Sequence, residues 1–85
     1  MADPQAELNA RMHRLVDAVR GEVPAETCSL VDEMVEANES PIALDTLSEV
    51  LAERSAVVAP EVISEFGALA AQLGLGSEVA SRLTR

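Results

Sequence analysis

Three acidic residues spaced four apart are the part of this sequence best placed to do chemistry. In the stretch NESPIALDTLSEVLAE, the side chains of Asp45, Glu49 and Glu53 would form one column on a helix. Like charges at this spacing destabilise an isolated helix by about 0.2–0.5 kcal/mol per pair. A column kept despite this penalty suggests a use for the charge, and the chemistry it favours is attraction of a cation-bearing partner.

The charge of the whole chain is concentrated around this column. The 85 residues carry a net charge of -9, while residues 1–21 and 54–85 each hold as many bases as acids. The excess therefore lies in residues 22–53, which contain no Lys or Arg. A surface of one sign attracts a partner of the other, although a purely solubilising role is the alternative. The acids of this window are Glu22, Glu26, Asp32, Glu33, Glu36, Glu39, Asp45, Glu49 and Glu53.

Apolar spacing and proline positions predict helices that carry these acids. A helix start is expected where proline follows a capping residue or a loop. Asn38 and Leu73-Gly74-Leu75 have the pattern of left-handed helix stops. We therefore expect one all-α domain over residues 1–85, a small bundle of four helices with a possible short fifth C-terminal helix. The expected starts are Asp3-Pro4, Pro24, Ser40-Pro41, Pro60 and, for the fifth helix, Ser77, and Gly21 is the expected stop of the first helix.

The second and third helices are expected to form an antiparallel hairpin, because only two or three residues separate them. Their apolar stripes, Leu30/Val31/Met34/Val35 and Leu44/Leu47/Leu51, would turn toward the rest of the bundle. The acids would then lie outward on both helices and form one broad negative surface. The residues expected to bind a partner are Asp32, Glu36 and Glu39 on the second helix and Asp45, Glu49 and Glu53 on the third.

Smaller features give further expectations. Glu7 with Arg11, and Arg14 with Asp17, have the spacing of ion pairs on the exposed side of the first helix. Gly67 falls inside the fourth helix, where glycine costs about 1 kcal/mol relative to alanine, so we expect close helix packing there. Phe66 is the only aromatic residue, so the core is expected to be aliphatic.

Enzymatic and ligand-binding classes fit the sequence poorly. Acid–base catalysis needs carboxylates in a pocket, whereas helical spacing puts these on convex faces. Cys28 and His13 are more simply read as a small buried residue and a boundary residue than as a nucleophile and base. With one His and one Cys a usual zinc site is excluded, and no calcium loop occurs. No cofactor is expected, and six scattered Arg with no Lys disfavour nucleic-acid binding.

Three stretches resemble the MafI family of immunity proteins, small bacterial proteins encoded beside polymorphic toxins. They are ESPIALDTLSEVL, starting at Glu39, VVAPEVI, starting at Val57, and LAAQLGL, starting at Leu69. Ala43-Leu44 matches an "A-L" pair of the family, while Asn38-Glu39 stands where members often have Gly-Glu. The resemblance covers about residues 30–76 and is carried by core and capping residues.

The resemblance implies an immunity protein that binds and neutralises a cognate toxin domain. Many such toxins are nucleases with cationic surfaces, which an acidic helical hairpin would suit. The family does not fix which acids touch the toxin. Without a secretory signal or an apolar stretch of 18 residues, the chain is expected to be cytoplasmic, and a monomer or weak dimer when free. The alternative is a non-enzymatic helical adaptor or homodimerisation domain, in which the acids only solubilise.

Overall fold

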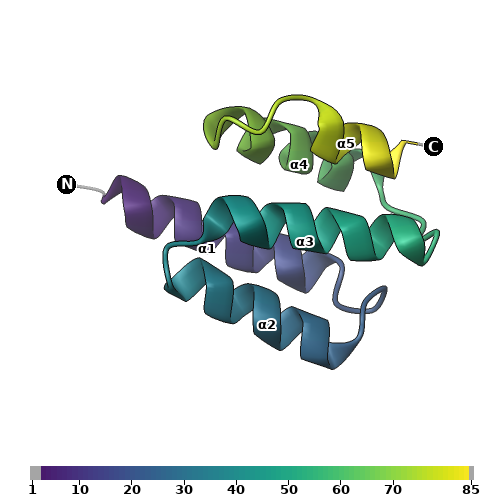
Figure 1. Ribbon diagram of the computed structural model, residues 1–85, viewed down its shortest axis with the longest axis horizontal. Coiled ribbons are helices and arrows are strands. Elements are labelled where there is room, and N and C mark those ends of the chain that lie inside the picture. Colours follow the sequence, from purple (N-terminus) through teal and green to yellow (C-terminus); the bar gives the residue numbers. More distant parts are fainter. Residues whose placement is uncertain (1–2, 85) are drawn as a thin grey trace.

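Proline stands in the first turn of α1, α3 and α4 and directly before α2, where its missing N–H breaks no helical hydrogen bond. In this computed structural model, which describes residues 3–84, the Asp3 carboxylate caps α1 by accepting a 3.0 Å hydrogen bond from the Gln5 N–H. The expected all-α bundle with a short fifth helix is confirmed (Figure 1). The helices are α1 (Pro4–Ala18), α2 (Ala25–Glu36), α3 (Ser40–Glu53), α4 (Pro60–Gln72) and α5 (Glu78–Leu83).

Left-handed residues end three of the helices. The stops expected at Asn38 and Gly74 are confirmed by φ angles of 62° and 74°. Ser55, which the sequence did not single out, ends α3 in the same way with φ 51°. In each case the following N–H returns to the last turn, as in a Schellman motif. The returning bonds are Glu39 N to Met34 O at 2.8 Å, Ala56 N to Leu51 O at 3.0 Å and Leu75 N to Ala70 O at 2.8 Å.

Two expected helix ends are placed differently. Ser40 is the first residue of α3 and makes no capping bond; Glu39 occupies the N-cap position. The Ser40 side chain is only 2% exposed, and its hydroxyl has no hydrogen-bond partner within residues 3–84. Burial of Ser40 thus overrides the capping preference of its side chain.

The first helix also ends earlier than expected, at Ala18 and not at Gly21.

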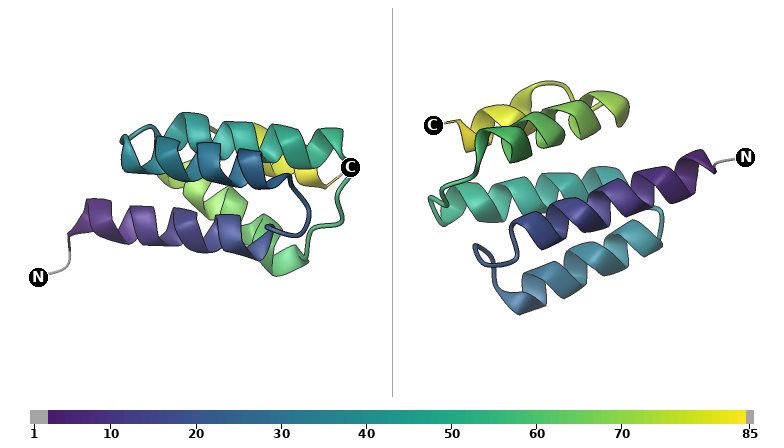
Figure 2. Two further views of the ribbon diagram at one scale, coloured as in Figure 1. Left: turned by 90° about the horizontal axis from the view of Figure 1, so that it is seen from below. Right: turned by 180° about the vertical axis from the view of Figure 1, so that it is seen from behind.

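The five helices form two layers. α2, α3 and α5 lie side by side in one layer, and α1 and α4 cover one face of it (Figures 1 and 2). α3 is the middle helix of its layer and packs against all four others. α2 and α3 form the expected antiparallel hairpin, joined by residues 37–39.

The core is aliphatic, with Phe66 of α4 fully buried in it. On α3 the expected stripe is confirmed, since Leu44, Leu47 and Leu51 are fully buried. On α2 the stripe is rotated from the expected one: Leu30 is 47% exposed, Met34 is half-buried, and the fully buried positions are Cys28, Val31 and Val35. This rotation decides where the acids of α2 point.

Gly67 tests how tightly α4 and α5 pack. A Cβ built at Gly67 would meet the Ala80 Cβ at 3.7 Å, an ordinary van der Waals distance, so the packing that we expected there leaves room for a methyl group. We predict that Gly67→Ala raises the free energy of unfolding by up to about 1 kcal/mol, because alanine loses less backbone entropy in a helix.

Urea unfolding followed by circular dichroism measures this change. Gly74→Ala is the matched control, since its φ of 74° strains any side chain, and it should lower stability by about 1 kcal/mol. A loss of stability in Gly67→Ala comparable to that of the control would show that α4 and α5 cannot accommodate the methyl group.

Candidate protein-binding surface

The outward side of α3 carries two of the expected acids. Ile42, Thr46, Glu49 and Glu53 follow the spacing of one helix face, and all but the half-buried Thr46 are exposed. This face is the side of α3 turned away from its buried stripe. Glu49 and Glu53 therefore lie outward, as expected, whereas Asp45 lies on the flank next to α5.

Asp45 is held by a base from the far end of the chain. The Arg82 guanidinium of α5 donates hydrogen bonds to the Asp45 carboxylate and, at 3.0 Å, to the Ser48 hydroxyl. That hydroxyl donates in turn to the Asp45 carbonyl at 2.8 Å. The expectation that Asp45 faces outward as part of a free column is wrong, because α5 packs along this flank of α3.

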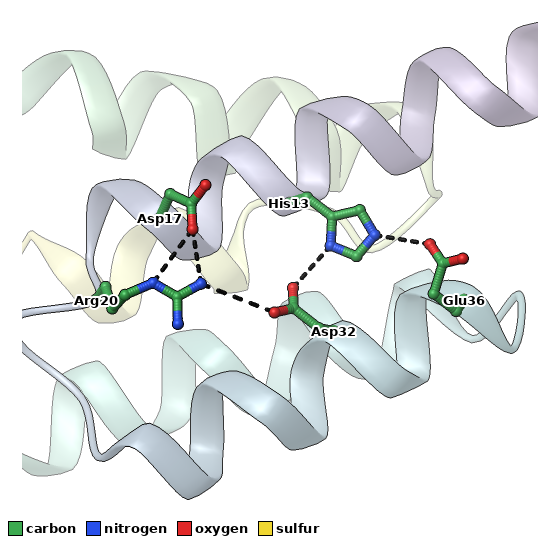
Figure 3. A network of polar contacts seen from close by, with 5 residues as sticks. All are labelled: His13, Asp17, Arg20, Asp32 and Glu36. Atoms are coloured by element: carbon green, nitrogen blue, oxygen red, sulfur yellow. Dashed lines mark hydrogen bonds and ion pairs between the residues drawn. The ribbon is translucent and has the colours of Figure 1, made fainter.

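Asp32 and Glu36 both contact a side chain of α1. His13 of α1 lies between them: its Nδ1 is 2.7 Å from Asp32 Oδ1 and its Nε2 is 2.7 Å from Glu36 Oε2 (Figure 3). Arg20 adds a weaker ion pair to Asp32 at 3.8 Å. The outward orientation expected for Asp32 is therefore wrong, whereas Glu36 stays exposed, as expected, but is paired with His13. The physical reason is the rotated apolar stripe of α2.

The geometry around His13 requires a charged ring. A neutral imidazole has one N–H donor, whereas both ring nitrogens here face carboxylate oxygens, which only accept. The hydrogen bond to Glu36, followed by that to Asp32, raises the pKa of His13 above its ordinary value. His13, which the sequence suggested only as a boundary residue, is thus a cationic bridge between α1 and α2.

The acids left facing solvent define a different surface from the expected one. On α2, Glu26 and Glu33 are exposed and lie one turn before and after the exposed Leu30. Glu39 is exposed in the connection to α3. Within residues 3–84 these acids, with Glu49 and Glu53, form no ion pair. We call this surface the outer acidic face: Glu26, Glu33, Glu39, Glu49 and Glu53, with the apolar Leu30 and Ile42.

Three of the six expected partner-binding residues, Glu39, Glu49 and Glu53, thus remain on the candidate surface. Glu26 and Glu33 were missed. The helical spacing of Cys28, Val31 and Val35 was the sequence signal from which the exposure of Glu26 and Glu33 could have been predicted. A stripe through Cys28 turns Glu26 and Glu33 to solvent and Asp32 toward α1.

Of the two remaining ion pairs within residues 3–84, one joins two helices and the other is local to the end of α1. Arg11 donates to both carboxylate oxygens of Glu65 on α4, at 3.1 and 2.9 Å, in place of the pair expected with Glu7. This hydrogen bonding lowers the pKa of Glu65. Asp17 pairs with Arg20 at 2.6 Å, not with Arg14 as expected.

Two further features of residues 3–84 concern metal binding and helix length. Within residues 3–84, no group of three or more His, Cys, Asp or Glu side chains is arranged to hold a metal ion. Over the same residues, every helix is too short or too polar to cross a membrane. Compared with protein-family models, curated proteins and solved structures, the chain matches none of them.

The His13 bridge predicts how stability depends on pH. Because the folded-state pKa of His13 is raised, its contribution is complete below the unfolded pKa of about 6.5 and is lost as pH rises through the folded pKa. The side chain is 34% exposed, so solvent screening limits this contribution to a few tenths up to about 1 kcal/mol.

Urea unfolding from pH 6 to pH 9 measures this loss in the native chain, and His13→Gln should show a flatter profile over the same range. The only histidine of the chain also gives an unambiguous NMR titration. A folded-state pKa at or below 6.5 would contradict the charged bridge.

Proposed function

We propose that this chain is an immunity-type inhibitor that binds a basic toxin domain through the outer acidic face. The observation that carries the proposal is the set of five exposed carboxylates without an ion pair within residues 3–84, arranged around exposed Leu30 and Ile42. The resemblance of about residues 30–76 to the MafI family supports immunity over other binding functions.

The mixed character of the face suits a protein partner. Carboxylates steer a basic protein to the surface and raise the association rate at low salt. Leu30 and Ile42, 47% and 55% exposed, add apolar area that a partner can bury for affinity. Both acids and apolar residues stand on convex helix surfaces, which suits contact with a second surface more than enclosure of a small substrate.

A nuclease is the toxin class that this charge favours. The substrate-binding surface of a nuclease attracts phosphate, so an acidic face could occupy it in place of nucleic acid. Such a partner acts in the bacterial cytoplasm, where the immunity protein would meet it. The proposal requires no catalysis by this chain and no cofactor.

The second candidate is a helical adaptor or homodimerisation domain. Exposed Leu30 and Ile42 favour it, because a second copy could cover them. The net charge of -9 opposes it, since pairing two outer acidic faces would bring like charges together. A homodimer that persists at high salt and excludes the basic partner would select this alternative.

A charge swap confined to the outer acidic face tests the proposal. The partner that the proposal expects is a toxin domain encoded by a neighbouring gene. Glu49→Lys with Glu53→Lys should slow association with that domain by about tenfold or more at low salt, and much less at high salt. Stopped-flow binding at several salt concentrations measures the rate. Loss of rescue when the variant is co-expressed with the toxin should accompany the slower rate.

The matched control is Glu7→Lys with Glu61→Lys, which changes net charge equally through exposed acids of α1 and α4. The control should slow association far less. If both double variants slow association equally, net charge and not the outer acidic face governs binding. If the neighbouring domain does not bind the native chain at all, the immunity proposal is wrong.

A further inference from the structure

A groove of about 390 Å³ runs between the start of α3 and α5, beside the outer acidic face. Its apolar lining comes from Pro41 and Ile42 of α3, Leu75 of the connecting loop and Val79 of α5. Val79 is buried, Pro41 and Leu75 are half-buried, and Ile42 is 55% exposed at the edge. The groove thus has an apolar base that solvent reaches, and its volume is large enough for one or two aliphatic side chains.

The walls of the groove are held in place before any partner arrives. Leu75 follows left-handed Gly74, and its N–H donates to the Ala70 carbonyl at 2.8 Å. Pro41 has a fixed φ in the first turn of α3. On the other side, Arg82 joins α5 to α3 through Asp45 and Ser48. A groove with fixed walls loses little conformational freedom on binding, which favours affinity.

The charges around the groove are unequal. Asp45, Glu78 and Arg82 line it, and Glu49 is close enough to act on Arg82. Two carboxylates and one guanidinium therefore line the groove, and hydrogen bonding to Asp45 already engages the guanidinium. Glu49 and Glu78 form no ion pair within residues 3–84. A cation above this rim would find two carboxylates available.

We infer that this groove is the anchor point of the proposed interface, and that it takes an aliphatic side chain of the partner flanked by Lys or Arg. The inference rests on the proposed function and names the chemistry recognised there. The aliphatic side chain enters between Ile42 and Val79, and the flanking cations pair with Glu49 and Glu78. Apolar anchors that fill pockets beneath a charged rim carry much of the energy of such interfaces.

Charge complementarity selects this occupant over a second copy of the chain. A second copy would bring a net charge of -9 toward a rim that is itself negative. Leu30 and Ile42, two of the three exposed large apolar side chains within residues 3–84, belong to residues 22–53, which contain no base to pair with Glu49 or Glu78; the third, Val57, follows the single base Arg54. A basic partner supplies both the apolar side chain and the missing cations.

Two synthetic peptides test the groove without the toxin. The amide-capped peptide KRLKLIRK carries aliphatic residues between cations, and KRSKSSRK has the same charge without them. NMR titration of the full chain should show methyl shifts at Ile42, Leu75 and Val79 with the first peptide. Its affinity should exceed that of the second by at least about fivefold.

Matched variants locate the binding. Ile42→Gln should remove the difference between the peptides, whereas Val57→Gln, a change of an exposed apolar residue outside the outer acidic face and the groove, should keep it; circular dichroism checks that both remain folded. Equal binding of the two peptides, or insensitivity to Ile42→Gln, would overturn the inference. So would self-association through the groove, seen as sedimentation that Ile42→Gln alters.

The outcome separates the two proposals. If the chain binds the aliphatic peptide in the groove but does not bind the toxin domain, the inference about the groove holds and the proposed immunity function is wrong. If the chain binds the toxin domain and Ile42→Gln leaves that affinity unchanged, the proposed immunity function holds and the groove is not the anchor of the interface.

Discussion

The position of α3 between α2 and α5, with α1 and α4 behind it, is the constraint on which the rest of this molecule depends. A helix packed on three sides keeps only a narrow strip for solvent. On α3 that strip is the face of Ile42, Glu49 and Glu53, while Leu44, Leu47 and Leu51 are buried. An acidic column with i, i+4 spacing cannot stay wholly within such a strip. Its first member, Asp45, consequently falls against α5, where Arg82 binds it.

The second constraint is the shortage of cations, six Arg against fifteen acids. Most bases with a defined partner lie where helices meet: Arg11 joins α1 to α4, His13 joins α1 to α2, and Arg82 joins α5 to α3. Arg54, at the end of α3, donates to the Glu22 carbonyl at 2.9 Å and so holds the loop between α1 and α2. With the bases used at these contacts, the outer acidic face is left without internal compensation. An external cation can therefore bind there without breaking a contact that holds the fold.

Local chemistry allowed much of the fold to be predicted from the sequence. Proline marked the helix starts, and Asn38 and Gly74 marked two stops, because these residues restrict or permit particular backbone angles. Ser40 failed as a predicted cap since tertiary burial, which no local pattern records, placed its side chain in the core. Ser55 also adopts a left-handed φ angle, which a serine side chain does not predict.

The candidate site was harder to predict because it depends on which flank of each helix is covered. Residues 22–53 contain no Lys or Arg, which indicated too few cations for their acids. In agreement, Glu39, Glu49 and Glu53 form no ion pair within residues 3–84. The partners of Asp32 and Asp45 come from residues 19 and 37 positions away in the chain. Helical spacing alone cannot tell that α1 lies on one flank of α2, or α5 on one flank of α3.

We propose that a basic protein binds the side of α2 and α3 turned away from α1 and α4. Amide hydrogen exchange of the full chain, alone and with the proposed toxin domain added, tests this. We expect added protection in the connection between α2 and α3, at the start of α3 and in α5, with α1 and α4 unchanged. Protection concentrated on α1 and α4 would contradict it.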